Sequence, residues 1–292
     1  MTIEPARRPR GVAIPVVLLL GLLGFATARP ARAERDRTWW SGTLVAGTGV
    51  EYSTGNYGDE ADTEIWDVPL SVKYIFEEIG LAPLDEVEFK VSIPFRRIRE
   101  PITSRSTNRV NRTGIGNLAL RLGYFHVPRK KIWPIVGALA RVRLETSSDE
   151  VGSDATDVSF ALDVSNAYEL GDGRYPRISP FARAGYRLAG SPGPGRERDD
   201  TWTTSVGATF RPIWDVGIGL AYDWGETTSS DGDQHEISPW ISWRVTPRFR
   251  IVPYAVFGLS TAAVDYAAGV AFRVSLDVEG HRDVPIRAGG ER

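Results

Sequence analysis

Hydrophobic and polar side chains alternate with a period of two along most of residues 40–274. Leu120 and Leu122, for example, share one face of their segment, while Arg121 and Gly123 share the other. Successive side chains of a β-strand point to opposite faces, whereas a helical pattern repeats every 3.6 residues. The alternation predicts about twelve strands of roughly ten to fifteen residues, near the length that a tilted membrane strand needs.

Most of these predicted strands carry a charge in the middle of their polar face, where a soluble sandwich would pack its core. A Lys or Arg facing lipid at the bilayer midplane costs on the order of 2 to 4 kcal/mol. Inverting the faces would put about two dozen charges into hydrocarbon, among them Arg121, Arg141, Arg183 and Asp163. The total cost would exceed the stability of any domain. We therefore expect an all-β fold, a single antiparallel up-and-down transmembrane β-barrel with its charges inside. A soluble periplasmic barrel or sandwich is the competing fold.

The charges of the inward faces are the candidate channel-lining residues. Twelve strands enclose a lumen between those of filled eight-stranded barrels and open sixteen-stranded porins. Such side chains leave either a narrow polar channel or a closed barrel whose charges satisfy one another. The candidates are Lys73, Glu86, Glu88, Lys90, Arg121, Arg141, Arg143, Asp157, Asp163, Arg183, Arg187, Asp223 and Arg273.

The connections between predicted strands alternate in length. Long polar ones follow odd strands, at 53–62, 97–112, 147–156, 191–200 and 227–234, and short ones follow even strands, at 128–131, 171–174, 212–213 and 246–247. Outer-membrane barrels have short periplasmic turns and long outer loops, so both termini are expected in the periplasm. Only the short connection at 261–263 breaks the rule.

Tryptophans near the strand ends predict an aromatic girdle at each membrane surface. The girdle candidates are Trp40, Trp66, Trp202, Trp214, Trp224 and Trp243. Six prolines fall inside predicted strands and count against closure, because proline cannot donate to the strand ladder. They are expected at bulges or strand ends, and they are Pro69, Pro94, Pro134, Pro180, Pro239 and Pro253.

The N-terminus resembles an export signal. Arg7, Arg8 and Arg10 precede an apolar run at 11–26, and Ala31 and Ala33 form a small-x-small cleavage site. The run is shorter than the roughly 20 residues of a spanning helix, although an uncleaved membrane anchor is the alternative. We expect a signal peptide at 1–33, the barrel at 34–276 and a polar periplasmic tail at 277–292. The outer membrane is then the expected location, with the bilayer, lipopolysaccharide and the outer-membrane insertion machinery as partners.

Composition removes several classes of function. Cysteine is absent, which excludes disulfides, thiolate metal sites and cysteine nucleophiles. The net charge of -2 does not suggest a general nucleic-acid binder. No cofactor and no metal site are expected.

Two features of the predicted outer loops suggest alternative chemistry. Arg99, Arg105 and Arg109 are candidates for a constriction if part of the loop 97–112 folds inward, and otherwise they contact lipopolysaccharide phosphates at the rim. His235 lies near Ser229 and Ser230, so a lipid-modifying enzyme is one alternative, and a solvated loop histidine is the simpler reading.

Several segments resemble a known group of proteins. They are 62–74, 91–95, the Gly114-Ile-Gly-Asn117 motif and 237–243. They are similar to the outer-membrane transporters grouped as the family of the MetA-pathway of phenol degradation, over roughly residues 40–276. Family members often carry Gly-x-Gly-Asp where Asn117 stands here, and they usually close on an aromatic residue. The resemblance implies an outer-membrane barrel that takes up small aromatic compounds.

Together the pattern and the resemblance predict passive passage of small molecules, including small aromatic or anionic solutes, without a catalysed reaction. The alternative is a structural or surface-binding outer-membrane barrel that transports nothing. Single-channel conductance separates the two.

Overall fold

The computed structural model describes residues 42–55, 62–77, 85–101, 109–128, 132–147, 151, 155–170, 175–190, 199–227 and 232–278. These residues form fourteen strands, which are β1 (Gly42–Gly55), β2 (Thr63–Glu77), β3 (Glu86–Pro101), β4 (Arg109–Ile115), β5 (Ala119–His126), β6 (Ile135–Arg143), β7 (Asp157–Ser165), β8 (Tyr168–Glu169), β9 (Arg177–Leu188), β10 (Thr201–Arg211), β11 (Val216–Gly225), β12 (Gln234–Arg244), β13 (Phe249–Gly258) and β14 (Tyr266–Val278). The predicted signal peptide and all of the predicted tail after Val278 lie outside the described residues.

No helix in this part of the chain is both long and apolar enough to cross a membrane.

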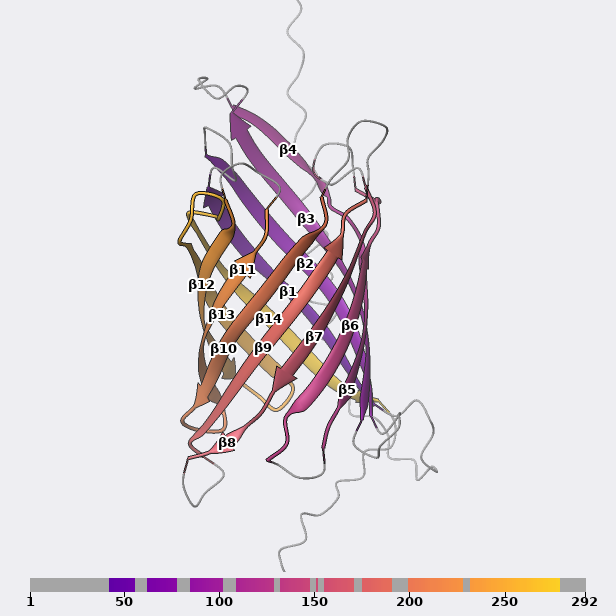
Figure 1. Cartoon of the computed structure of the whole chain (residues 1–292), viewed down its shortest axis with the longest axis vertical. Coiled ribbons are helices and arrows are strands. Elements are labelled where there is room, and N and C mark those ends of the chain that lie inside the picture. Colours follow the sequence, from indigo (N-terminus) through magenta and orange to yellow (C-terminus); the bar gives the residue numbers. More distant parts are fainter. Residues whose placement is uncertain are drawn as a thin grey trace, which may run out of the picture. The chain divides into compact units, whose positions relative to one another are not determined.

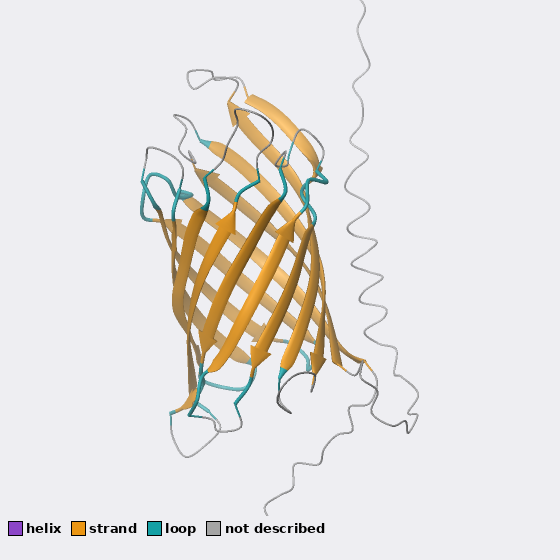
Figure 2. Cartoon of the chain, turned by 45° about the vertical axis from the view of Figure 1, so that its right-hand side comes forward, coloured by secondary structure: helices purple, strands orange, loops and turns teal. Residues whose placement is uncertain are grey.

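The strands close into one antiparallel barrel (Figures 1 and 2). β14 pairs with β1, consecutive strands pair around the wall, and β9 pairs with β10 to complete the ring. β4 and β5 together form one wall strand beside β3, and β8 extends β7 beside β9. The wall therefore has twelve strands, as predicted. Residues 212–215 and 245–248 join strands at what we call the short-turn end.

The two faces of the wall differ sharply in polarity. Large apolar side chains on the outer face are open, as shown by the exposed fractions of Leu122 (55%), Leu162 (62%) and Leu220 (53%). In water so large an apolar surface would not persist on a single soluble domain. The charged positions alternate with these leucines and occupy the inner face. This arrangement excludes the soluble sandwich and places the apolar face toward lipid.

A β-bulge interrupts the wall between β4 and β5. Phe95 pairs with Ile115 and Ser92 pairs with Ala119, so three steps along β3 match four steps along its partner. The extra residue is characteristic of a bulge. Gly116 donates its N–H to the carbonyl of Pro94 at 2.8 Å, an approach at which a Cβ would crowd the proline ring. The Gly114-Ile-Gly-Asn117 motif therefore lies at this bulge, with Gly116 and Asn117 between β4 and β5.

The expectation for the prolines is only partly met. Pro134 precedes β6, and Pro94 lies inside β3 beside the bulge. The other four lie inside strands, and the paired positions between β12 and β13 are interrupted around two of them. Each missing N–H costs one ladder hydrogen bond, which long strands paired on both sides can sustain. The four interior prolines are Pro69, Pro180, Pro239 and Pro253.

Candidate functional site

Four predicted lining residues form a continuous row of cations on the inner face. Lys73 pairs in register with Lys90, Lys90 with Arg121, and Arg121 with Arg141, on the adjacent wall strands β2, β3, β5 and β6. Like charges at directly opposed positions destabilise a sheet. We call these four residues the basic row. The strand pairing thus places four positive charges side by side, an arrangement that does not favour the stability of the sheet.

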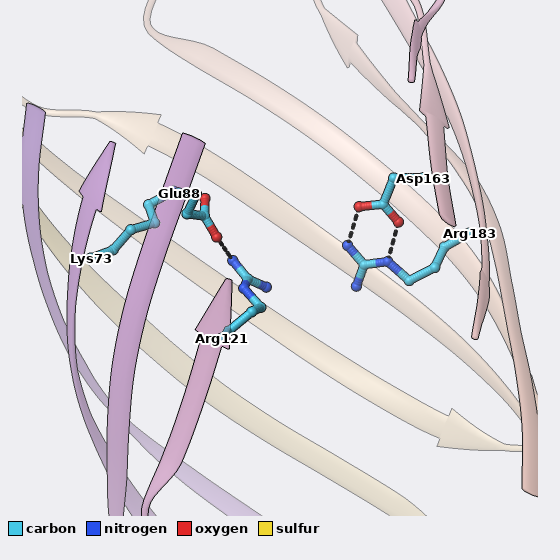
Figure 3. Close-up of polar contacts among 5 residues, drawn as sticks. All are labelled: Lys73, Glu88, Arg121, Asp163 and Arg183. Atoms are coloured by element: carbon cyan, nitrogen blue, oxygen red, sulfur yellow. Dashed lines mark hydrogen bonds and ion pairs between the residues drawn. The ribbon is translucent and has the colours of Figure 1, made fainter. Parts of the chain in front are cut away.

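One carboxylate, Glu88, compensates part of the basic row (Figure 3). Its Oε2 accepts a hydrogen bond from Lys73 Nζ at 2.9 Å, and its Oε1 accepts one from Arg121. The side chain of Glu88 is only 7% exposed. Lys90 and Arg141 have no ion pair with any residue that the structure describes. The row therefore keeps an excess of positive charge.

Other predicted lining residues pair across neighbouring strands. Arg183 Nη2 donates to Asp163 at 2.8 Å, in a two-point contact that Figure 3 shows on a separate part of the wall. Arg143 bonds Asp157, which also accepts the N–H of Gly190 at 3.1 Å. Such charge-assisted pairs fix the side chains in place and cancel their charges locally.

The remaining lining candidates are distributed over the same inner face. Asp223 accepts a hydrogen bond from Ser238 at 3.0 Å. Arg273 lies in register with Arg250, which lies in register with Arg244, so a second set of cations follows β12, β13 and β14. The alternation also assigns the last two candidates, Glu86 and Arg187, to the inner face.

Aromatic rings also lie on the inner face. Phe181, Trp240 and Tyr254 alternate with lipid-facing residues and point inward from β9, β12 and β13. The ring centroids of Phe181 and Trp240 lie 6.1 Å apart although two strands separate them. We call these three residues the aromatic arc. Sequence reasoning passed over Phe181 and Trp240, because an aromatic residue on the polar face breaks the expected alternation.

Glycines on the neighbouring strands make room for the aromatic arc. A Cβ at Gly219 would lie 2.0 Å from the Trp240 ring, and one at Gly207 or Gly269 would lie 2.7 Å from Phe181 or Tyr254. The rings therefore lie close against the inner wall, over backbone without side chains. Glycine opposite an aromatic residue is a sequence signal that could have revealed these contacts.

The rim arginines lie away from the basic row. Arg109 donates to Glu64 at 2.9 Å, and Arg99 contacts the same carboxylate at 3.5 Å. Glu64 shares the face of Trp66, so these two arginines lie on the lipid-facing side of the wall beyond Trp66. Arg105, the third constriction candidate, lies outside the described residues.

The described girdle candidates occupy two levels. Trp66, Trp202 and Trp224 lie near strand ends on the long-loop side, while Trp214 and Trp243 lie at the short-turn end. Tyrosines extend both groups, since Tyr52 and Tyr186 contact Trp66 and Trp202 and Tyr175 contacts Trp214. Trp40 lies outside the described residues.

The histidines do not form a hydrolytic arrangement within the part that the structure describes. His235 Nδ1 lies 2.6 Å from the Tyr222 hydroxyl, on the lipid-facing side, and its predicted serine neighbours are outside the described residues. His126 Nδ1 lies 2.9 Å from the fully buried Asp85, which also accepts the Tyr124 hydroxyl. This group fastens the end of β5 to the start of β3 at the short-turn end.

Solved outer-membrane barrels have similar folds at low sequence identity. An outer membrane channel from Pseudomonas putida F1 matches with a TM-score of 0.63 and 13% identity, over 83% of this chain and 100% of that one. The translocator domain of the autotransporter NalP from Neisseria meningitidis has a TM-score of 0.50 and 8% identity, over 91% and 95%. The NanC porin has a TM-score of 0.50 and 10% identity, over 80% and 100%. Because their activities differ, the likeness shows the fold alone.

No curated protein matches the sequence. A family model does, and it covers nearly the whole barrel from the first residue of β1. The chain therefore belongs to the family described as "Putative MetA-pathway of phenol degradation", whose model matches residues 42–276.

Proposed function

We propose that this protein is a passive outer-membrane channel for small solutes and that its interior favours anions. The basic row carries the proposal. It sets four cations side by side on adjacent strands, and among the described residues Glu88 is the carboxylate that bonds them. Pores that select anions use rings of Arg and Lys, and a low-dielectric wall strengthens the field of such charges.

The outer face supports residence in a membrane. Exposed leucines cover the wall between two levels of tryptophan, which is the surface that a barrel presents to lipid and to its interfaces. A signal peptide at 1–33 would bring the chain to the periplasm, where the insertion machinery acts. Lipopolysaccharide would then contact the rim arginines Arg99 and Arg109.

The cargo we propose is a small organic solute that crosses unchanged. The family description names phenol degradation, which makes single-ring compounds the first solutes to test. Passage needs no cofactor, because selectivity comes from the charges and width of the wall.

Conductance in planar bilayers tests the proposal. Purified protein under a KCl gradient should give single-channel current steps. Its reversal potential should be shifted from zero toward the equilibrium potential of chloride. Lys90→Gln with Arg141→Gln should move the reversal potential toward zero, because these two cations of the basic row have no ion-pair partner among the described residues.

The matched control is Arg99→Gln with Arg109→Gln, which removes two cations from the rim. It should leave the reversal potential unchanged. A folded protein without conductance would mean a closed barrel and would end the proposal. A reversal potential that responds to the rim pair and not to the inner pair would assign selectivity to the outer loop instead.

A further inference from the structure

The aromatic arc and the basic row lie at the same depth in the barrel. Each of their residues lies four to six positions from the end of its strand on the short-turn side. Strands of one barrel rise at a similar tilt, so equal distances along them give similar heights. The two groups therefore belong to one cross-section of the interior.

Within that cross-section they occupy opposite sides. The basic row follows β2, β3, β5 and β6, whereas the aromatic arc follows β9, β12 and β13. β7 separates them on one side of the ring, and β14 and β1 separate them on the other. A solute passing this level would meet cations on one side and flat apolar rings on the other.

The aromatic arc is accessible from the interior. Its three side chains are half-buried, and Phe181 borders a cavity of about 280 Å³ that is also lined by Phe125, Arg183 and Ser205. An apolar cavity of about 150 Å³ is enough to hold benzene, so a single-ring molecule fits this space. Tyr254 donates its hydroxyl to Glu51, which leaves the face of its ring as the surface offered to a solute.

We infer that this cross-section recognises small organic anions that carry a flat ring, such as an aromatic carboxylate. The inference rests on the proposed channel function and narrows its solute class. The ring of the solute stacks on the aromatic arc, and its carboxylate faces the basic row. Stacking and charge together distinguish this class from small inorganic anions and from neutral ring compounds. Pairs of aromatic rings contribute about 0.5–1.5 kcal/mol beyond area burial, which corresponds to roughly a two- to tenfold preference.

The test compares benzoate, acetate and benzamide on the full-length protein in planar bilayers. Benzoate shares its ring with benzamide and its charge with acetate. In the wild type, benzoate should interrupt the chloride current at concentrations roughly two- to tenfold lower than acetate, which has no ring to stack. It should also act at lower concentrations than benzamide, which has no charge to face the basic row. Phe181→Leu with Trp240→Leu should remove this difference and keep the preference for anions over cations in the KCl gradient.

The control variant is Trp243→Leu, which removes a tryptophan from the lipid-facing side of the same strand as Trp240. It should leave the benzoate effect intact. If benzoate and acetate act alike while the chloride preference persists, the inferred recognition of aromatic anions is wrong and the proposed channel function is retained. If benzamide matches benzoate, charge plays no part in recognition and the inference fails. If the wild type shows no preference for anions, the proposed function itself is wrong.

Discussion

The ring of Trp240 covers Gly219, a residue on the neighbouring strand that has no side chain. Three atoms of the ring lie within 2.5 Å of the point where a Cβ of residue 219 would stand. The ring cannot move outward, because the backbone of the wall lies beneath it. Any side chain at position 219 must therefore push the ring toward the barrel axis.

We expect Gly219→Ala to lower the single-channel conductance, because the displaced indole would narrow the interior. Gly225→Ala is the matched control on the inner face of the same strand. A Cβ there would lie 3.6 Å from its nearest neighbour, which is ordinary van der Waals contact. Conductance of the Gly225 variant should equal that of the wild type. Equal conductance of both variants would show that Trp240 does not border the pathway.

Single charged residues were predictable from the sequence, and the inner aromatic residues were not. Arg121 and Asp163 stand out because a charge on one face of an alternating segment has only one tolerable side in a membrane. Trp240 stands between Pro239 and Ile241, and Tyr254 lies in a strand whose polar face also carries Val252 and Val256. An aromatic side chain packs favourably both in lipid and against a glycine of the inner wall. Its residue type alone therefore does not show whether it faces lipid or the interior.

At the scale of one strand, β7 shows how alternation fixes both faces. Leu162 is open to the outside, and its neighbour Ala161 faces the interior opposite Leu139 and Gly185. The two residues differ by one step along the backbone and by the medium that surrounds them.

An arginine placed at each of these two positions should therefore have unequal effects. Leu162→Arg should lower the free energy of unfolding by about 2–4 kcal/mol, the cost of a cation on the lipid side. Ala161→Arg should change it by less than about 1 kcal/mol, because its side chain reaches the polar interior. Urea unfolding in lipid vesicles measures both. Similar losses at the two positions would contradict the orientation of β7.

Strand number and strand type followed from the sequence, but the irregularities did not. Alternation continues on both sides of the bulge at residues 116–118, so the pattern shows no sign of the extra residue. The interior prolines were expected at ends or bulges because each removes a ladder hydrogen bond. The wall retains them inside long strands that are paired on both sides, which is a tertiary effect that no local pattern contains.

Closure of the whole barrel was predictable from a simple requirement. In hydrocarbon every backbone N–H and C=O needs a partner, so a membrane sheet cannot keep a free edge. The arrangement of the interior was less accessible, because the cross-section that joins the aromatic arc to the basic row depends on strand pairings far apart in sequence.

Two truncations test closure at the level of the whole molecule. Removing residues 266–292 deletes β14, so that β1 keeps only β2 as a partner and β13 keeps only β12. This variant should fail to give the heat-dependent shift in gel mobility that marks a folded barrel. Removing only residues 279–292, after the end of β14, should preserve the shift and the conductance. A heat-dependent shift in the shorter variant would show that the barrel closes without its last strand.

The pairing of β1 with β14 also has a consequence for the time course of assembly. The hydrogen bond between Tyr254 of β13 and Glu51 of β1 crosses β14. It joins residues 203 positions apart in sequence. Contacts of such high contact order form slowly, because a long loop must be closed before any of them is gained. The pairing of β1 with β14 is therefore expected to form late in assembly. Variants that weaken it should accumulate as late, unclosed intermediates rather than fail at the start.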